Sequence, residues 1–563
     1  MNDHVSGRGL TRRSLFQRAA VGAATPALAG LLTGGLTAGA AESGELAIAW
    51  NAPPPDFNPL TAVSRSQFWF HSSVMSSLVK PNPEAQQFDP DLADSWEIAP
   101  DGSAYTFTLR QNAAWHDGEP VTARDVAFTY SLALNPDTLS KQTGKLSLIM
   151  GAAAYTAKEA AEVAGIQVVD DSTIVFEMEF PNGLFLYEAV LPILPEHILG
   201  SVAATDLETH DFFINAPVGS GPFRFVAYRP DQFVEVEANP DYHFGAPNIR
   251  RIVFNIIKSP DTIDVAIGRD EIDLPVFDGG TAVTSLFEKY VTDDRFRIDA
   301  TQGSSVVGYG WNFRHDYLAD PRIHQAFLHA IDRNALIQAF NAGNGTVFNS
   351  FMTHSWYQKP EWSELYPYDP ERARALLQEA DWDSSRTVGV NVITLANEQI
   401  RAMVAAEQQM LADVGFNVEF QEMEAAVWVE KFYETYDFEL VRVTFGVFAD
   451  PDGFLNFHMK TTSQNAFGYS NPELDARIEE GRRAVDQEAR VPLYQAINEE
   501  MLETLPVCPL YIENLWWLRH QRWQVPQLDS LPRATSIETI PVAPILTNTQ
   551  DVWSLHQEEW TTA

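Results

Sequence analysis

Residues 89–126 read DPDLADSWEIAPDGSAYTFTLRQNAAWHDGEPVTARDV, a stretch that combines strand and turn patterns. Apolar and polar residues alternate over residues 105–109, which is the period of a half-buried strand. The turn residues 101–102 predict a hairpin between this strand and a strand at residues 96–98. A second turn is predicted at residues 117–118. These residues define backbone shape, so His116 is predicted to be structural and not a general base.

Helix starts are marked by capping side chains, several of them followed by proline. Thr122 and Asp125 have the spacing of a capping box. Other starts are predicted at Asp320-Pro321, Asp332, Asp369-Pro370 and Asn471-Pro472. Further strands are predicted at residues 174–180, 223–226, 234–237, 252–257 and 418–421. Helices and strands are therefore interleaved along the chain, which predicts an α/β fold with mixed sheets.

The composition is that of a globular protein with an acidic surface. The chain has 563 residues, which favours two or three domains. It contains 38 Lys+Arg against 76 Asp+Glu, a formal net charge of −38. Such a balance argues against a nucleic-acid partner, because phosphate neutralisation needs clustered basic residues. The lone Cys508 excludes an intrachain disulfide and is predicted to be a buried thiol.

Residues 1–40 have the three parts of an export signal. A basic start contains Arg12 and Arg13, a stretch rich in small residues covers 19–40, and residues 38–41 supply an Ala-x-Ala-type end. The paired arginines resemble a twin-arginine signal. We therefore expect export, signal cleavage and a soluble periplasmic protein. No cysteine lies near the cleavage region, and no later segment is apolar enough to span a membrane.

Searches for catalytic and metal-binding motifs find no convincing match. Residues 219–222 lack the context of a nucleophile elbow and are predicted to form a turn. His324 and His329 are five residues apart on a predicted helix and point in different directions. Residues 450–453 lack the remaining ligands of a calcium loop, which also predicts a turn. The sequence thus predicts a protein that is not an enzyme and has no metal site and no cofactor.

Ordered blocks along the chain resemble the extracellular solute-binding proteins of family 5, the peptide, opine and nickel binders of ABC importers. The first block is the stretch at residues 89–126. The later blocks are residues 217–223, 239–242, 271–274, 320–333, 368–373 and 450–452. Each block alone is a weak signal, whereas their order and spacing together cover nearly the whole predicted mature chain.

The resemblance implies a two-lobed periplasmic binding protein fold of the cluster C type, with mixed sheets and an inserted domain II. Crossing segments would join the lobes, and the ligand would be enclosed between them. The expected layout is a signal peptide at residues 1–40, lobe I at 41–88, 213–300 and 505–563, domain II at 89–212, and lobe II, or domain III, at 301–504.

By family position, the resemblance implies that four segments face the ligand. They are residues 64–68, 309–313, 353–357 and 445–450. The candidate ligand-binding residues in them are Arg65, Gln67, Trp311, Trp356, Phe445, Val447, Phe448 and Asp450. Aromatic walls with a few polar anchors suit the enclosure of a small solute. The alternative is that the aromatic residues form the cores of the lobes.

One position departs from the family pattern. Peptide-binding members have an aspartate three positions before the acid that Asp450 matches, and it pairs with the peptide amino terminus. Here that position is Val447. An ammonium group facing valine would lose a charge-assisted bond that contributes about 1.5–3 kcal/mol, although Asp450 or Asp452 could substitute. Ordinary dipeptides are therefore disfavoured, while Arg65 offers a cation for an acidic ligand.

The function that follows from the resemblance is that of a substrate-binding protein of an ABC importer. It would capture a small solute of the peptide, opine or oligosaccharide type and deliver it to a permease in the inner membrane. We expect a monomer with a small-molecule ligand and no nucleic-acid partner. The alternatives are a sensory solute-binding protein that presents its ligand to a membrane receptor, or a metal-chelate binder.

Overall fold

The computed structural model describes residues 44–62, 64–82, 87–277, 284–350, 352, 356–393, 398–446, 450–461, 465–529, 533–534, 542–543 and 560–562. The predicted export signal lies outside the described residues, and so do Val447 and Phe448. Within these ranges, no helix combines the length and the apolar character that a membrane crossing requires.

A first mixed sheet has the strand order β11-β1-β10-β9-β8. The strands are β1 (Glu45–Trp50), β8 (Phe223–Arg229), β9 (Phe233–Ala238), β10 (Arg251–Ile256) and β11 (Leu274–Val276). β1 is parallel to β10 and β11, whereas β9 is antiparallel to β10 and β8. Trp50 stacks on Phe254 at a centroid distance of 4.2 Å. The helices in this part are α1 (Arg65–Val74), α6 (Pro260–Gly268) and α7 (Thr284–Tyr290).

A second sheet lies within the region predicted as domain II and has the order β4-β5-β7-β6. Its antiparallel strands are β4 (Ala93–Ile98), β5 (Ala104–Leu109), β6 (Ile166–Asp170) and β7 (Thr173–Glu177). The accompanying helices are α2 (Ala123–Leu134), α3 (Ala152–Thr156), α4 (Phe185–Glu188) and α5 (Glu196–Leu199). Tyr105, Phe176 and Phe185 pack in its core. The hairpin of β2 (Val79–Asn82) and β3 (Gln87–Pro90) precedes it.

A third sheet has the order β13-β17-β12-β16-β14-β15, with β19 beside β12. The strands are β12 (Phe296–Trp311), β13 (Thr346–Val347), β14 (Thr387–Ile393), β15 (Asn417–Met423), β16 (Leu440–Gly446), β17 (Val507–His520) and β19 (Val542–Ala543). The helices are α8 (Pro321–Ala330), α9 (Arg333–Phe340), α10 (Pro370–Glu379), α11 (Glu398–Asp413), α12 (Ala425–Val429), α13 (Pro451–Phe454), α14 (Pro472–Arg483) and α15 (Gln487–Thr504). The remaining elements are α16 (Pro526–Asp529), β18 (Trp523–Gln524) and β20 (Thr561–Thr562).

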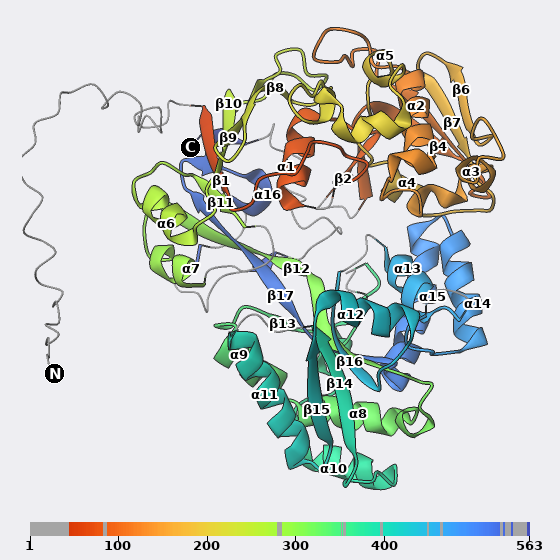
Figure 1. Cartoon of the computed structure of the whole chain (residues 1–563), viewed down its shortest axis with the longest axis vertical. Coiled ribbons are helices and arrows are strands. Elements are labelled where there is room, and N and C mark those ends of the chain that lie inside the picture. The colour runs from red at the N-terminus through yellow and green to blue at the C-terminus, as the bar shows by residue number, and fades with distance from the viewer. Residues whose placement is uncertain are drawn as a thin grey trace, which may run out of the picture. The chain divides into compact units, whose positions relative to one another are not determined.

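β12 and β17 connect two separate hydrophobic cores. They pair antiparallel from Phe296 opposite His520 to Gly310 opposite Val507, with a break in register between Gln302 and Val306. Figure 1 shows both strands running from beside α6 and α7 to the sheet that contains β16. The start of β12 packs in one core and its end packs in another. This pair of strands is therefore the physical link between the two cores.

Most of the predicted elements are present. Thr122 and Asp125 form the capping box of α2, in which the Thr122 N–H donates to the Asp125 carboxylate at 2.8 Å. Helices α8, α10 and α14 begin at the predicted prolines, and α9 begins after its predicted cap Asp332. One prediction was wrong, because residues 450–453 begin helix α13 and do not form a simple turn.

Local hydrogen bonds explain the structural role of His116. Its Nε2 lies 3.0 Å from the Gly221 carbonyl oxygen, and its Nδ1 accepts the Gly219 N–H at 3.3 Å. Burial is the main cause that lowers the pKa of His116 to about 4. The ring therefore joins the second turn of the opening stretch to residues 219–221 as a neutral group.

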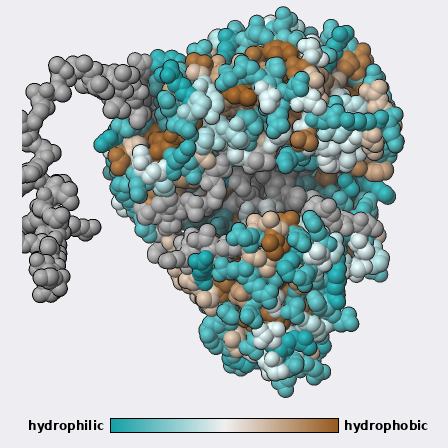
Figure 2. Space-filling view, viewed as in Figure 1, coloured by the Kyte–Doolittle hydropathy of each residue, from teal (hydrophilic) through white to brown (hydrophobic). Residues whose placement is uncertain are grey.

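The surface in Figure 2 is mostly hydrophilic, with apolar residues in small separate patches. Such a surface agrees with the large excess of acidic residues. Among the described residues, the exposed large apolar side chains include Phe68, Val169 and Phe180. Single exposed apolar residues are normal in soluble domains, so they do not by themselves indicate an interface.

Candidate functional site

The segment that contains Arg65 and Gln67 is the start of helix α1. Ser64 is the N-cap, and its side chain and that of Gln67 form a reciprocal capping box. Gln67 is 1% exposed, and its amide nitrogen donates to the Asp56 carboxylate at 2.9 Å. The side chain of Gln67 is thus used in a capping role inside the protein, and its contact with ligand stays a prediction.

Arg65 is partly buried on the same helix. Its guanidinium donates to the Phe277 carbonyl oxygen at 2.8 Å and lies 5.4 Å from the centroid of the Trp517 ring. Arg65 thus contacts a residue that follows β11 and a residue of β17.

Trp311 lies in the core and does not form a ligand wall. Its side chain is 0% exposed and stacks on His324 at a centroid distance of 4.4 Å. The indole N–H points to the Cys508 sulfur at 3.3 Å. Burial chiefly raises the pKa of the Cys508 thiol to about 12, so this cysteine is the buried thiol that was predicted. Trp311 packs in this core because its face of β12 meets α8, which favours the alternative that it is a core residue.

Phe445 lies at the end of β16 among other aromatic rings. It is 8% exposed, and its centroid lies 5.6 Å from Phe454, 4.4 Å from His458 and 6.0 Å from Phe467. This packing supports the alternative that Phe445 belongs to a lobe core. The two residues that follow it in the prediction, Val447 and Phe448, lie outside the described part of the chain.

Asp450 is buried and bound to an arginine of α15. The guanidinium of Arg490 donates to both oxygens of Asp450 at 2.6 Å, and the two side chains are 4–5% exposed. Asp450 also caps α13 by accepting the Asp452 N–H at 3.0 Å. Burial is the largest effect and lowers the pKa of Arg490, but the charges of Asp450 and Tyr494 and the hydrogen bonds to both together outweigh it and raise the pKa of this guanidinium. Asp450 therefore forms a buried ion pair in this structure, and its contact with ligand stays a prediction.

Trp356 is the predicted site residue that remains partly exposed beside this ion pair. Its ring lies 5.4 Å from the Arg490 guanidinium and 5.4 Å from the Tyr494 ring. Tyr494 in turn accepts a hydrogen bond from Arg490 at 2.8 Å. We call Trp356, Asp450, Arg490 and Tyr494 the Arg490 cluster. The structure thus brings Trp356 of one predicted ligand wall and Asp450 of another to the same arginine.

Asp452 is a second buried acid next to the Arg490 cluster. It is 3% exposed, and burial is the largest of the effects that raise its pKa to about 6. The Nε of Arg482 lies 3.6 Å from one carboxylate oxygen, and its charge opposes that rise. The other oxygen, Oδ1, has no hydrogen-bond partner among the described residues. Asp450, which is paired with Arg490, therefore lies next to Asp452, whose pKa is raised to about 6.

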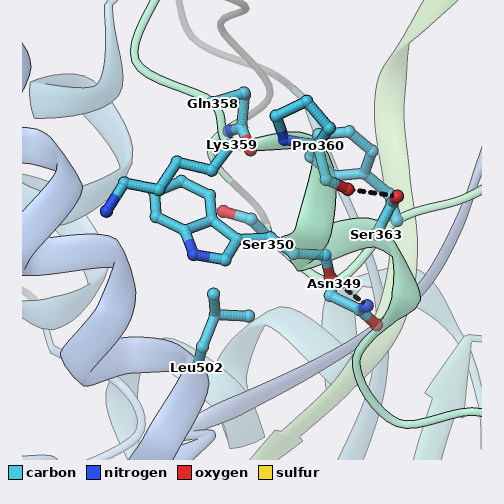
Figure 3. Close-up of a pocket in the computed structure, with 9 residues that line it drawn as sticks. Asn349, Ser350, Gln358, Lys359, Pro360, Ser363 and Leu502 are labelled. Carbon is cyan, nitrogen blue, oxygen red and sulfur yellow. Dashed lines mark hydrogen bonds between the residues drawn. The ribbon is translucent and has the colours of Figure 1, made fainter.

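A pocket of about 300 Å³ lies between the segment of residues 348–363 and Leu502 of α15, as Figure 3 shows. Its lining residues are Phe348, Asn349, Ser350, Gln358, Lys359, Pro360, Trp362, Ser363 and Leu502. Asn349 is held by Arg333, which donates to it at 2.6 Å, and by the Trp362 carbonyl, which accepts from it at 2.6 Å. This rigid wall and the apolar floor at Leu502 suit one side-chain-sized group.

Tyr357 separates the pocket from the Arg490 cluster. Its ring lies 5.0 Å from Trp356 on one side and 6.4 Å from Trp362 on the other. Lys359 reaches over the Trp362 ring at 5.4 Å and pairs with Glu499. Tyr357 therefore packs between the pocket and the Arg490 cluster, and both adjoin α15 through Leu502 and Arg490.

Sequence reasoning missed Arg490 and Tyr494, whose contacts hold the Arg490 cluster together. They are four residues apart in α15, so they share one face of the helix. A buried arginine on an aromatic face is a signal that it has an acidic partner elsewhere, but the sequence cannot say which acid. Within the described ranges, there is also no group of three side chains from His, Cys, Asp and Glu that could hold a metal ion.

The comparisons with known proteins identify the family of this fold and site. Residues 87–466 match the family described as bacterial extracellular solute-binding proteins, family 5 Middle. The chain therefore belongs to the family 5 solute-binding proteins. A relative from Brucella ovis is 34% identical over 368 residues, which cover 64% of this chain and 65% of that protein. This chain thus spans just under two thirds of that relative's length.

Other similar proteins cover more of the chain. The oligopeptide-binding protein AppA of Bacillus subtilis is 26% identical over 494 residues, 84% of this chain and 87% of that protein. Its structure in complex with a nonapeptide has a TM-score of 0.65 at 22% identity, covering 92% of this chain and 99% of that chain. The ABC transporter substrate-binding protein CtaP of Listeria monocytogenes has a TM-score of 0.74 at 22% identity, covering 91% and 99%. The predicted fold class, the two-lobed α/β fold of this family, is confirmed.

Proposed function

We propose that this protein is the substrate-binding component of an ABC importer. The observation that carries the proposal is the family match over residues 87–466, together with a fold similar to that of substrate-binding proteins. In this role the protein captures one solute between two closing lobes and delivers it to a membrane permease. It performs no chemistry on the solute, in keeping with a family of binding proteins.

The proposed closing motion uses the strands that connect the cores. β12 and β17 support this idea because they are long, paired and interrupted in register between Gln302 and Val306. A register break disrupts the ladder locally and allows a bend. The proposed domain layout keeps lobe I at residues 41–88, 213–300 and 505–563, domain II at 89–212 and lobe II at 301–504. We propose that the protein acts as a monomer.

The proposed ligand is of the peptide type, and ordinary dipeptides are disfavoured. A dipeptide brings an ammonium group that needs a carboxylate when water is excluded. Val447 replaces the usual anchor, and the Asp450 carboxylate is already bound on both oxygens by Arg490. Trp356 and the neighbouring pocket are the proposed apolar contacts, and Arg65 is the proposed partner of an acidic group.

The test of the function is identification of a co-purifying solute. The protein is purified natively, denatured, and the released small molecules are analysed by mass spectrometry. A released compound is then added back in a thermal unfolding assay. Binding to the folded state alone adds about 2.7 kcal/mol of stability at one hundred times the Kd. If no peptide, opine or oligosaccharide stabilised the protein in this assay, the proposal would be contradicted.

The ligand class is tested by titration calorimetry with dipeptides and longer peptides on the unaltered chain and on Val447→Asp. We expect the unaltered chain to bind ordinary dipeptides weakly and Val447→Asp to bind them more tightly. Trp356→Ala should weaken binding of the co-purified solute, whereas Trp382→Ala serves as a control, because Trp382 stacks on Phe416 away from this cluster. Tight dipeptide binding that ignores Val447→Asp would refute this assignment.

We further propose that the protein reaches the periplasm through the twin-arginine route. The support is the paired Arg12 and Arg13 before a weakly apolar stretch. Changing both arginines to lysine should leave uncleaved precursor in the cytoplasm, as judged by fractionation and mass. Unchanged export of the double variant, or export in a strain without that translocase, would exclude this route.

A further inference from the structure

A loop of the region proposed as domain II contacts the connector between α14 and α15. The backbone N–H of Gly183 donates to the Arg482 carbonyl oxygen at 3.1 Å. This carbonyl lies in the last turn of α14, where a helix leaves its carbonyl groups without internal partners. The loop therefore completes the hydrogen bonding of a helix end that belongs to another part of the fold.

Two glycines allow the backbones to approach this closely. A Cβ atom on Gly183 would clash with the Ala484 carbonyl oxygen and would lie 3.3 Å from the Val485 Cα. A Cβ atom on Gly102 would clash with the Val485 side chain. We call this interaction, in which Gly102 and Gly183 face residues 482–485, the glycine contact. It needs a small residue at both glycine positions.

Both sides of the glycine contact are rigid. On one side, the Asn182 carbonyl accepts the Tyr105 hydroxyl at 2.5 Å, and the Asn182 N–H donates to the Gly102 carbonyl at 3.2 Å. On the other side, Arg490 donates to the Gly481 carbonyl in the last turns of α14 at 3.2 Å. The contact therefore joins two preformed surfaces, and forming it requires little local ordering.

A second observation places the same region near the Arg490 cluster. Tyr187 lies in α4, close after the loop that contains Gly183. Burial chiefly raises its pKa, the charge of Asp450 adds to that rise, and the charge of Arg490 opposes it. Charges of these two side chains affect Tyr187 because they are near it and shielded from water. Helix α4 thus lies near the Arg490 cluster, close to the glycine contact.

We propose that the glycine contact is a latch between domain II and lobe II, which forms when the lobes close and helps to hold them closed. The inference rests on the proposed function, because a binding protein must open to admit its solute. The groups that meet are two glycines, an alanine, a valine and backbone carbonyls. Opening can therefore expose them to water without leaving a buried charge unpaired. Domain II thereby acquires a role in closure.

The first test measures how fast a thiol at position 485 reacts with a maleimide. Val485→Cys is labelled in the unaltered background and in a Gly183→Ala background, where the added Cβ clashes with the Ala484 carbonyl oxygen and disrupts the contact. The control background is Gly144→Ala, because a Cβ on Gly144 meets no atom within 4 Å. The native Cys508 is buried and does not compete. We expect labelling to be at least about threefold faster with Gly183→Ala than with Gly144→Ala, since the intact contact shields position 485.

The second test measures compaction by small-angle X-ray scattering. With Val485 unchanged, Gly183→Ala should have a larger radius of gyration than Gly144→Ala. Equal labelling rates in the two backgrounds would show that the contact does not form in solution. Faster labelling with Gly183→Ala at an unchanged radius of gyration would show that the contact does not hold the lobes closed and is not a latch.

These measurements need no solute, so they separate the latch from the proposed function. A protein that closes and opens through the glycine contact but never binds a solute would refute the function and keep the latch. A protein that binds its co-purified solute equally well as Gly183→Ala and Gly144→Ala, with equal compaction, would keep the function and refute the latch.

Discussion

Arg490 carries a buried charge whose partner lies on a different element. Its guanidinium is 4% exposed and binds both oxygens of Asp450. Removing one member of a buried ion pair leaves the other charge unpaired and costs about 3–5 kcal/mol. We therefore predict that Arg490→Met lowers the free energy of unfolding by about that amount, measured by urea denaturation.

The matched control for this prediction is Arg374→Met. Arg374 pairs with Glu371 on the surface of α10, with side chains 44% and 88% exposed. Exposed pairs contribute about 0–1 kcal/mol, so this variant should remain close to the unaltered chain. Equal losses for the two variants would show that burial of the Arg490 pair has no special effect. Arg490→Lys should fall between them, because it keeps the charge but not the two parallel hydrogen bonds.

Asp452 predicts a pH dependence of stability with a defined sign. Its pKa is raised, chiefly by burial, from 3.8 to about 6. The folded state thus holds a proton there between about pH 4 and pH 6 that the unfolded state releases. This proton contributes stability below pH 4 that is lost as the pH rises through 6. The stability of the unaltered chain relative to Asp452→Asn should therefore fall between pH 4 and pH 7.

The measurement is urea denaturation of both proteins at several pH values. Asp383→Asn is the comparison, because hydrogen bonds from Ser385 lower the pKa of Asp383 and give the opposite sign. The contribution of Asp383 is present above its unfolded pKa and disappears as the pH falls. A difference between the unaltered chain and Asp452→Asn that stays constant from pH 4 to pH 7 would contradict the raised pKa.

At the scale of elements, β12 contains a glycine that its partner strand requires. A Cβ on Gly303 would clash with the Glu513 carbonyl oxygen of β17, at the break in register. Forcing extra atoms into such a site costs about 1–3 kcal/mol. We predict that Gly303→Ala lowers the unfolding temperature. Gly446→Ala in β16 is the control, because a Cβ there meets no described atom within 4 Å, and it should be nearly neutral. Two variants of equal stability would mean that the strands can separate at Gly303 without loss.

The elements that sequence reasoning predicted well have local causes. A cap, a proline or an alternation acts within a few residues, so helices α2, α8 and α9 begin where the residues indicate. β12 is different, because the glycine and serines at its centre break the alternation and the strand forms through pairing with β17. Propensity cannot anticipate a strand that distant partners impose.

The candidate site was predicted less well, for a physical reason. An aromatic residue at a strand end reads the same in sequence whether it faces a core or a ligand. Trp311 and Phe445 proved to be core residues, whereas Trp356 is partly exposed beside Arg490. The deciding contacts come from helices α8 and α15, and only the assembled fold positions them. The family resemblance predicted the fold and the class of protein. It did not predict which side chains of the four ligand-facing segments pack in a core instead.

At the scale of the whole molecule, the topology joins segments that are far apart in the sequence. β1 pairs in parallel with β10. The partner of the first described strand is therefore available only after the region proposed as domain II has been synthesised. Pairings of this kind raise contact order and slow folding. A chain exported through the proposed twin-arginine route would cross the membrane folded, which suits a protein whose first sheet depends on such distant strands.

The charge of the whole chain predicts how its stability depends on salt. Acidic residues exceed basic residues by 38, so at least half of the carboxylates have no basic side chain of their own to pair with. Their mutual repulsion destabilises the compact state, while salt shortens its range from about 10 Å at 0.1 M to about 3 Å at 1 M. Salt also weakens exposed ion pairs such as Lys158 with Asp137, but each of these contributes little. Repulsion should dominate, and we predict that the unfolding temperature rises between 20 mM and about 500 mM sodium chloride. The rise should shrink near pH 4.6, where the net charge vanishes. An unfolding temperature that falls with salt at pH 7 would show that local ion pairs, and not the excess charge, control the stability of the molecule.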